Sequence, residues 1–264
     1  MTRRVGRLAF IAIGAVLAVV PMASATYGGR VVGRSTAMSL AYYTVAENGL
    51  ISECSGAMVA RTKIMTAAHC VRPEVRGRRV AVVGRQARIG NPGPGSRTAR
   101  IIRVAVHPRY RPLVPQAGFD LAVLTLNRPV GSPIEVAEPQ DEAVLSRVGA
   151  TAVFSGFGVT PSNQGWRPRP ARAVSLEVLP PYNCVLPSRI RGFARNQLCA
   201  ASPGRGICSG DSGGPLTVRI DGRRRLVGVA TLALEEVPCR SVVGMFTRVT
   251  AVRQWVQRQI GRAR

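Results

Sequence analysis

The chain has 264 residues, of which 46% are hydrophobic and 19% charged, and its formal net charge at pH 7 is +24. This length fits one large all-β domain or two smaller lobes, with enough apolar residues to fill a core. The glycine and proline contents exclude a collagenous chain and do not indicate a disordered one.

The first 25 residues have the pattern of a secretory signal. Three arginines precede an apolar run at 8–20, and the small residues Ala23-Ser24-Ala25 fit a cleavage site. The run is shorter than the roughly 20 residues of a membrane-spanning helix. We therefore expect a secreted protein from which 1–25 is removed, with a twin-arginine signal as the alternative export route. No later stretch is long and apolar enough to span a membrane.

Short β-rich runs separated by Gly, Pro and Asn clusters follow along the chain, which favours a barrel or a sandwich. We predict strands within 56–60, 79–84, 100–108, 120–126, 150–158, 173–180, 215–220, 224–234 and 245–250. Only the C-terminal segment has helical spacing, with one apolar face that we assign to core packing, formed by Val252, Trp255, Val256 and Ile260.

The positive charge is almost entirely arginine, because Lys63 is the only lysine. Ten arginines and no acidic residue lie between Val75 and Phe119. Such a field attracts anionic surfaces, including acidic polysaccharide, a bacterial envelope or nucleic acid. The competing interpretation is biased coding with solvated surface loops. We keep an anionic surface as a candidate partner and expect no specific nucleic acid.

Six cysteines follow the predicted signal, and an even count in a secreted chain predicts disulfides. The residues alone do not choose among the connectivities. A metal site is the competing interpretation, but the chain has no CxxC pair and only two histidines, His69 and His107. We predict neither a metal nor another cofactor.

The stretch "GICSGDSGGP" at 206–215 surrounds Ser212 with glycines, as either a flexible loop or a nucleophile turn would. A serine hydroxyl needs a base to act as a nucleophile. His69 in "MTAAHC" is the better base, because His107 in "VHPRY" has the pattern of a surface turn. Asp120, at the start of an apolar strand, would orient the imidazole. Each residue alone has a structural explanation, whereas the set predicts a catalytic site.

The motifs "TAAHC", "DLAVLTL" and "GDSGGP", with "SGFG" at 155–158 and "HPRY" at 107–110, resemble those of the trypsin/chymotrypsin family of serine proteases. The resemblance covers nearly all of 31–264. It implies an all-β fold of two antiparallel six-stranded β-barrels packed together, with a C-terminal α-helix.

The resemblance implies a secreted serine endopeptidase that cleaves proteins or peptides through an acyl-enzyme. Ser212 would be the nucleophile, His69 the general base and Asp120 its orienting acid. The backbone N–H groups of Gly210 and Ser212 would form the oxyanion hole. The alternative is a basic, non-catalytic or dual-role protein that binds anionic envelopes or polysaccharides. We expect a monomer.

The resemblance also implies a maturation route. Cleavage after Arg30 by a second protease would free the α-amino group of Val31, which would pair with Asp211. Residues 26–30 would then be a short propeptide and 31–264 the protease domain. The implied disulfides are Cys54–Cys70, Cys184–Cys199 and Cys208–Cys239.

By the same resemblance, the floor of the specificity pocket is Gly206, where no carboxylate is present to bind a basic side chain. Ile207 should narrow the pocket. The remaining wall would come from Thr231, Leu232, Ala233 and Gly244. We predict a preference for uncharged, small to medium apolar residues before the cleaved bond, and no calcium site in the acid-free loop at 75–100.

Overall fold

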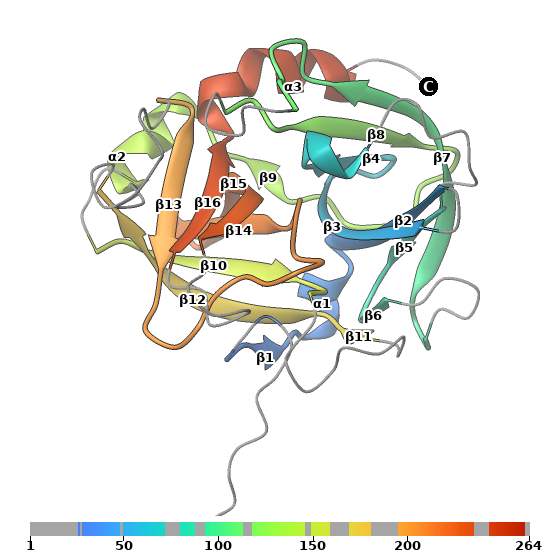
Figure 1. The fold of residues 1–264 in the computed structure, drawn as a ribbon, viewed down its shortest axis with the longest axis horizontal. Helices are drawn as coiled ribbons and strands as arrows, with labels where there is room; N and C mark the ends of the chain where they lie inside the picture. The colour runs from blue at the N-terminus through green and yellow to red at the C-terminus, as the bar shows by residue number, and fades with distance from the viewer. Residues whose placement is uncertain are drawn as a thin grey trace, which may run out of the picture.

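The computed structural model describes residues 26, 28–47, 50–71, 80–87, 93–112, 118–145, 149–158, 169–180, 195–234 and 243–261. These residues are mostly β-strands, arranged as two barrels that lie side by side (Figure 1). The predicted signal, 1–25, lies outside the described residues. Within the described ranges, none of the helices is long and apolar enough to cross a membrane.

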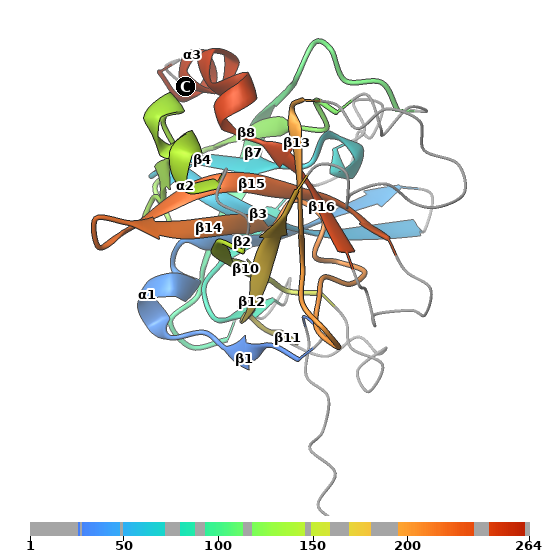
Figure 2. The same cartoon turned by 90° about the vertical axis from the view of Figure 1, so that its left-hand side faces the viewer.

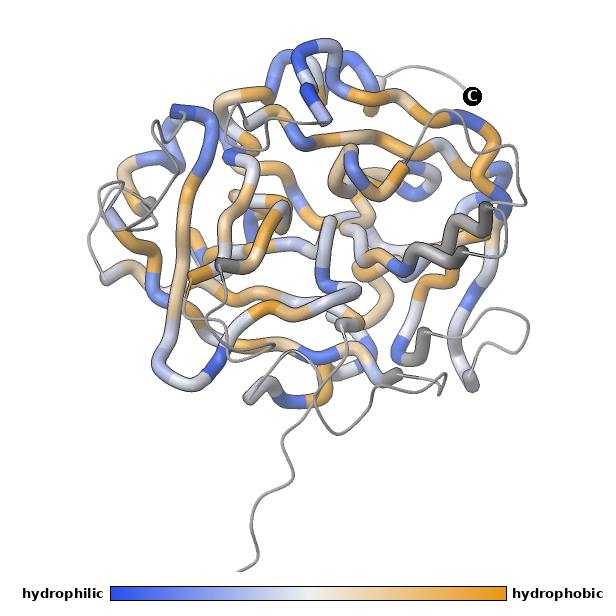
Figure 3. Tube along the Cα trace, in the orientation of Figure 1, coloured by the Kyte–Doolittle hydropathy of each residue, from blue (hydrophilic) through white to orange (hydrophobic). Residues whose placement is uncertain are grey.

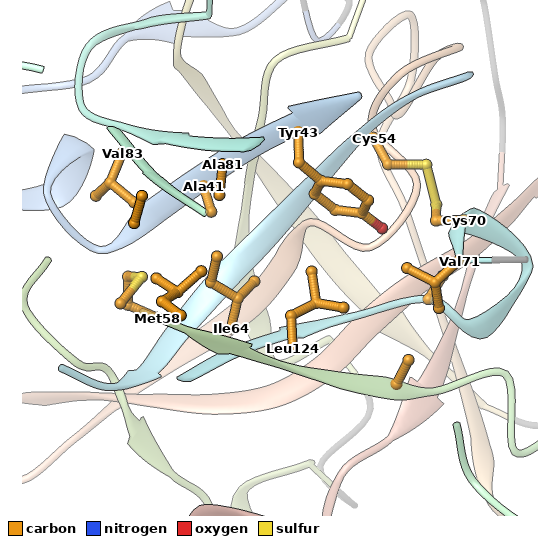
Figure 4. Close-up of a cluster of buried hydrophobic side chains, with 14 of the residues drawn as sticks. Ala41, Tyr43, Cys54, Met58, Ile64, Cys70, Val71, Ala81, Val83 and Leu124 are labelled. Atoms are coloured by element: carbon orange, nitrogen blue, oxygen red, sulfur yellow. A yellow bond between two sulfur atoms is a disulfide. The ribbon is translucent and has the colours of Figure 1, made fainter. Parts of the chain in front are cut away.

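The first barrel is closed and antiparallel. Its strands, in the order in which they pair, are β2 (Leu40–Glu47), β3 (Leu50–Ala60), β4 (Lys63–Thr66), β8 (Ala122–Leu126), β7 (Arg97–Val106) and β5 (Val80–Val83). Tyr43, Met58, Ile64 and Leu124 fill the interior, as Figure 4 shows, and all four side chains are fully buried. The barrel therefore has an apolar core of its own.

The second barrel is also antiparallel and closes where β12 pairs with β13. Its strands, in pairing order, are β12 (Arg172–Leu179), β10 (Thr151–Gly156), β14 (Pro215–Ile220), β15 (Arg223–Leu234), β16 (Val243–Arg248) and β13 (Gln197–Ala201). Phe154, Leu216 and Phe246 lie fully buried in its core. Two short strands extend its sheet, β1 (Arg30–Val31) beside β12 and β9 (Glu135–Val136) beside β15. The predicted pair of six-stranded barrels is confirmed.

A third apolar cluster joins the barrels. It combines Met65 of β4 with Leu226 and Val229 of β15, and the C-terminal helix α3 (Arg253–Gly261) packs onto it. Figures 1 and 2 show α3 capping one end of the molecule. The predicted apolar face of this segment is confirmed as core packing, because Trp255 and Val256 are buried in the same cluster.

All nine predicted strand segments coincide with strands, and among the described residues hydrophobic stretches follow the strands of both barrels (Figure 3). The remaining short elements are α1 (Arg34–Ala37), α2 (Glu142–Leu145), β6 (Gln86–Ala87), β11 (Arg169–Pro170) and 3-10 helices at Ala68–Cys70, Pro139–Asp141 and Thr250–Val252. Of the barrel strands, β2, β4 and β13 were not predicted, nor were the short strands β1, β6, β9 and β11.

Candidate active site

A cavity of about 370 Å³ is lined by residues of both barrels. His69 and Asp120 come from the first barrel and Ser212 from the turn before β14, so all three predicted catalytic residues line one cleft. The other lining residues are Tyr110, Pro112, Ile207, Cys208, Ser209, Ala230, Thr231, Leu232 and Ala233.

His69 lies in the 3-10 helix that follows β4. The neighbouring Cys70 is joined by a disulfide to Cys54 of β3, as the first predicted pair requires. The disulfide ties the short helix to the barrel wall. The backbone around His69 is therefore fixed, while 37% of its side chain stays exposed to the cleft.

Asp120 holds the ring of His69. Its Oδ2 lies 2.6 Å from His69 Nδ1, and its Oδ1 accepts the backbone N–H of His69 at 2.9 Å. The Asp120 residue is only 2% exposed. Thr247 Oγ1 donates to the backbone oxygen of Asp120 at 3.1 Å and anchors the loop from the second barrel. Because the carboxylate accepts a hydrogen bond from Nδ1–H, the lone pair of the neutral imidazole is on Nε2.

Ser212 is half-buried in the same cleft. In the described part of the chain, its hydroxyl is not hydrogen-bonded to the ring of His69, and His69 Nε2 lies 3.6 Å from Cys70 Sγ. Catalytic hydrogen bonds are often long in free enzymes and tighten when substrate binds. The structure thus brings His69 and Asp120 into contact and sets Ser212 beside them.

In the 208–214 turn, three backbone amides have no hydrogen-bond acceptor among the described residues. Gly210 has a φ of +88°, a region that favours glycine. The N–H groups of Asp211, Gly213 and Gly214 donate to backbone oxygens of Cys208, Ala230 and Asp211. Among the described residues, those of Ser209, Gly210 and Ser212 have no acceptor. The amides of Gly210 and Ser212 are the two that the sequence predicts for an oxyanion hole.

Ser55 of β3 connects this turn to the first barrel, a role that the sequence did not predict. Its hydroxyl donates to the backbone oxygen of Gly210 at 2.8 Å and accepts the N–H of Phe157 at 3.0 Å. Its own N–H donates to the backbone oxygen of Ser212 at 2.8 Å. One buried residue therefore fixes the backbone on both sides of Asp211.

Asp211 is fully buried and accepts hydrogen bonds from three parts of the chain. Its carboxylate receives the N–H groups of Gly158 and Cys208 at 2.8 and 2.9 Å and the Thr26 hydroxyl at 3.4 Å. A Cβ atom at position 158 would lie 2.5 Å from Asp211 Cγ, so this end of the "SGFG" motif must be glycine.

The structure does not bring Val31 and Asp211 together. Val31 is 43% exposed on β1, where it pairs with Arg172. The described residues of the predicted propeptide are also part of the fold, because Thr26 and Gly29 are buried and Arg30 begins β1. The residue that reaches Asp211 is Thr26.

The predicted specificity residues divide into two groups. Ile207, Thr231, Leu232 and Ala233 line the cleft, whereas Gly206 and Gly244 are buried and do not line it. A Cβ atom at Gly244 would lie 3.2 Å from Ile207 Cδ1, so the isoleucine fills the space beside this glycine. The hydroxyl of Thr231 contacts Val229 O and Thr247 Oγ1, both at 3.3 Å.

The remaining cysteines are partly described. Cys199 and Cys208 are each in a disulfide, but their predicted partners, Cys184 and Cys239, lie outside the described residues. The side chains of Cys54, His69 and Cys70 come within 4.8 Å of one another. Because both sulfur atoms belong to the disulfide, they cannot act as thiolate ligands, and this cluster does not fit a metal.

Two barrels with a histidine, an aspartate and a serine in one cleft are features of the two-barrel serine endopeptidases. Comparisons with known proteins agree. The family model described as Trypsin matches residues 31–256. A trypsin from Saccharopolyspora erythraea is 31% identical over 211 residues, which is 78% of this chain and 86% of that protein.

Two mammalian proteins are also similar. Chymotrypsin-like elastase family member 1 of Canis lupus familiaris is 28% identical over 217 residues, 78% of this chain and 81% of that protein. Coagulation factor IX of Cavia porcellus is 26% identical over 209 residues, which is 76% of this chain and 71% of that protein. The chain belongs to the trypsin family and is a serine endopeptidase.

His107, predicted to lie in a surface turn, is instead buried, with 6% of the residue exposed. Its ring stacks on Phe119 and meets Trp255 edge-on, both at 4.9 Å between ring centroids. Burial, followed by the nearby charges of Arg109 and Arg258, lowers the pKa of His107. The second histidine is therefore a core residue outside the cleft.

This shift predicts a pH dependence of stability. His107 binds a proton more readily in the unfolded state than in the folded state. The contribution of the neutral His107 to the free energy of unfolding is therefore present above the ordinary pKa of about 6.5 and is lost as the pH falls through the lowered value. In a Ser212→Ala background, His107→Gln should flatten the fall in unfolding free energy between pH 7 and 5, by up to about 1.4 kcal/mol per pH unit. Denaturant unfolding at several pH values measures this. If the unfolding free energy has the same pH dependence with and without His107, the lowered pKa of this histidine is contradicted.

Proposed function

We propose that this protein is a secreted endopeptidase in which Ser212 is the nucleophile, His69 the general base and Asp120 the residue that orients His69. The contact of 2.6 Å between His69 Nδ1 and Asp120 Oδ2, in the cleft that Ser212 also lines, is the observation that carries the proposal. The buried carboxylate sets the ring's tautomer and stabilises the imidazolium that forms when Nε2 takes a proton.

The reaction has two balanced halves. Ser212 Oγ attacks the carbonyl carbon of the peptide bond, its proton moves to His69 Nε2, and the carbonyl electron pair moves onto oxygen. When that pair returns, the C–N bond breaks, and the amine leaves with the proton from Nε2. Water then repeats the sequence on the acyl-enzyme, with His69 taking a proton from water and returning one to Ser212. The products are an acid and an amine.

Two of the three unused amides of the turn can stabilise the oxyanion. The N–H groups of Gly210 and Ser212 donate to no acceptor among the described residues, so a negatively charged oxygen could receive both. Ser55 supports this arrangement, because it holds the Gly210 and Ser212 carbonyls. Such preorganised donors are a large part of catalysis by this kind of site.

The cleft favours small or medium apolar side chains before the cleaved bond. Ile207 and Ala233 line it with apolar atoms, and Ile207 also fills the space beside Gly244. Of the predicted pocket residues, none carries a charge that could pair with arginine or lysine. Glu235 and Glu236, which could favour basic residues, lie outside the described part of the chain.

The charge of +24 leaves an anionic surface as a second partner of the same enzyme. A protein that only bound such a surface would not need a buried aspartate against an exposed histidine beside a serine. We therefore propose proteolysis as the activity and surface retention as a property that accompanies it.

Removal of the nucleophile tests the mechanism. In the protein purified after secretion, Ser212→Ala should lower kcat/KM on a peptide library by roughly 10⁶-fold, and Asp120→Asn should lower kcat by roughly 10⁴-fold. A fluorophosphonate probe should label wild type and not Ser212→Ala. Ser202→Ala, which removes a hydroxyl outside the cleft, is the matched control. Unchanged labelling of Ser212→Ala would refute the assignment of the nucleophile.

The pocket assignment makes a separate prediction. Ile207→Ala should raise kcat/KM for Phe or Tyr relative to Val before the cleaved bond by about 10-fold or more, because the removed methyl groups open space beside Gly244. Val218→Ala is the matched control, since Val218 is equally buried in the second barrel but does not line the cleft. A preference that is identical in both variants would place the specificity pocket elsewhere.

A further inference from the structure

Thr26 occupies an unusual place for a residue that begins the exported chain. It is fully buried, although it is 185 residues away in sequence from its partner Asp211. Its hydroxyl donates to Asp211 Oδ1 at 3.4 Å. By contrast, Arg30 and Val31 are exposed. The start of the described chain is thus inserted into the protein beside the residue that precedes the nucleophile.

A glycine turn directs Thr26 inward. Gly28 has a φ of +75°, and the N–H of Gly29 donates to the backbone oxygen of Thr26 at 2.6 Å. A Cβ atom at position 29 would lie 2.8 Å from both the Thr26 and the Ala173 backbone oxygens. Side chains larger than hydrogen would therefore disrupt the turn. The close fit indicates that the inward path of this segment is specified by the sequence.

The segment after the turn is held as a strand. Arg30 pairs with Ala173 and Val31 with Arg172, and the Val32 N–H donates to the Ala171 oxygen at 3.0 Å. Arg172 Nη1 also donates to the Gly29 oxygen at 3.1 Å. A protease that cut after Arg30 would have to detach this strand first. Val31 would then have to displace Thr26 to reach Asp211.

We propose that Thr26, and not Val31, supplies the α-amine that pairs with Asp211, so that removal of the signal after Ala25 is the only cleavage needed for activity. This inference rests on the proposed peptidase function. Hydrolysis of the Ala25–Thr26 peptide bond adds one water and leaves a carboxylate on Ala25 and an ammonium on Thr26. No activating protease is required.

The geometry allows the ion pair. The backbone nitrogen and Oγ1 of a threonine are separated by three bonds and so lie roughly 3 Å apart. Because Oγ1 lies 3.4 Å from Asp211 Oδ1, the Thr26 nitrogen is within roughly 7 Å of this oxygen, a distance that the freed chain end can shorten by rotation. A charged hydrogen bond to a buried carboxylate is stronger than the neutral one from the hydroxyl. It would fix Asp211, and with it the turn that carries Gly210 and Ser212.

The test compares N-termini of the secreted protein. Intact mass and N-terminal sequencing of the active enzyme should show a chain that begins at Thr26, and a chain that begins at Val31 would overturn the inference. Arg30→Gln, which blocks the alternative cleavage, should change kcat/KM by less than about threefold, as should its control Arg34→Gln at another exposed position. The inference would also be overturned if Arg30→Gln, but not Arg34→Gln, lowered kcat/KM by about 100-fold or more. A loss of that size is typical when an oxyanion-hole donor is removed.

One inserted residue provides the converse test. A glycine placed between Ala25 and Thr26, with its retention checked by intact mass, moves the amine out of register and should slow fluorophosphonate labelling by about 100-fold or more. Labelling at the wild-type rate would contradict the inference. If only a chain beginning at Val31 is labelled, the inference fails and the peptidase function stands. If neither the Thr26 form nor the Val31 form is labelled, the proposed function itself fails.

Discussion

The buried carboxylate of Asp211 is the interaction on which the active cleft depends. An ionised group without access to water is costly unless donors surround it. Here the donors come from Thr26, Gly158 and Cys208, three regions that are far apart in the sequence. Once these contacts fix Asp211, its neighbours Gly210 and Ser212 have little freedom. The stability of the charge and the position of Ser212, the proposed nucleophile, therefore have the same physical origin.

The two barrels supply different residues of the site. The first barrel supplies the rigid pair of His69 and Asp120, braced by the Cys54–Cys70 disulfide. The second supplies the turn that carries Ser212. Ser55 reaches across from the first barrel to the carbonyls of that turn, and the apolar cluster around Met65 and α3 keeps the barrels packed together. Because the cleft is shared, its geometry depends on both cores.

The sequence predicted most of the fold and the site because those parts are local patterns. Short β-rich runs between turn residues and the motifs around His69, Asp120 and Ser212 were all recognisable. The short strand β4 was missed because it has only four residues and begins with a lysine. All four residues are buried, and the Lys63 ammonium donates a hydrogen bond to the Thr125 hydroxyl. The roles of Ser55 and Thr26 could not be predicted, since they arise only from contacts with residues more than 100 positions away.

The most direct test of the role of Asp211 is the rate at which a fluorophosphonate probe labels the Asp211→Asn variant. Asparagine keeps the size of the side chain but removes the charge that organises the turn. The account predicts a protein that is still folded by near-UV circular dichroism but is labelled at Ser212 about 100-fold or more slowly than wild type, comparable to the loss of an oxyanion-hole donor. A folded variant labelled at the wild-type rate would contradict it.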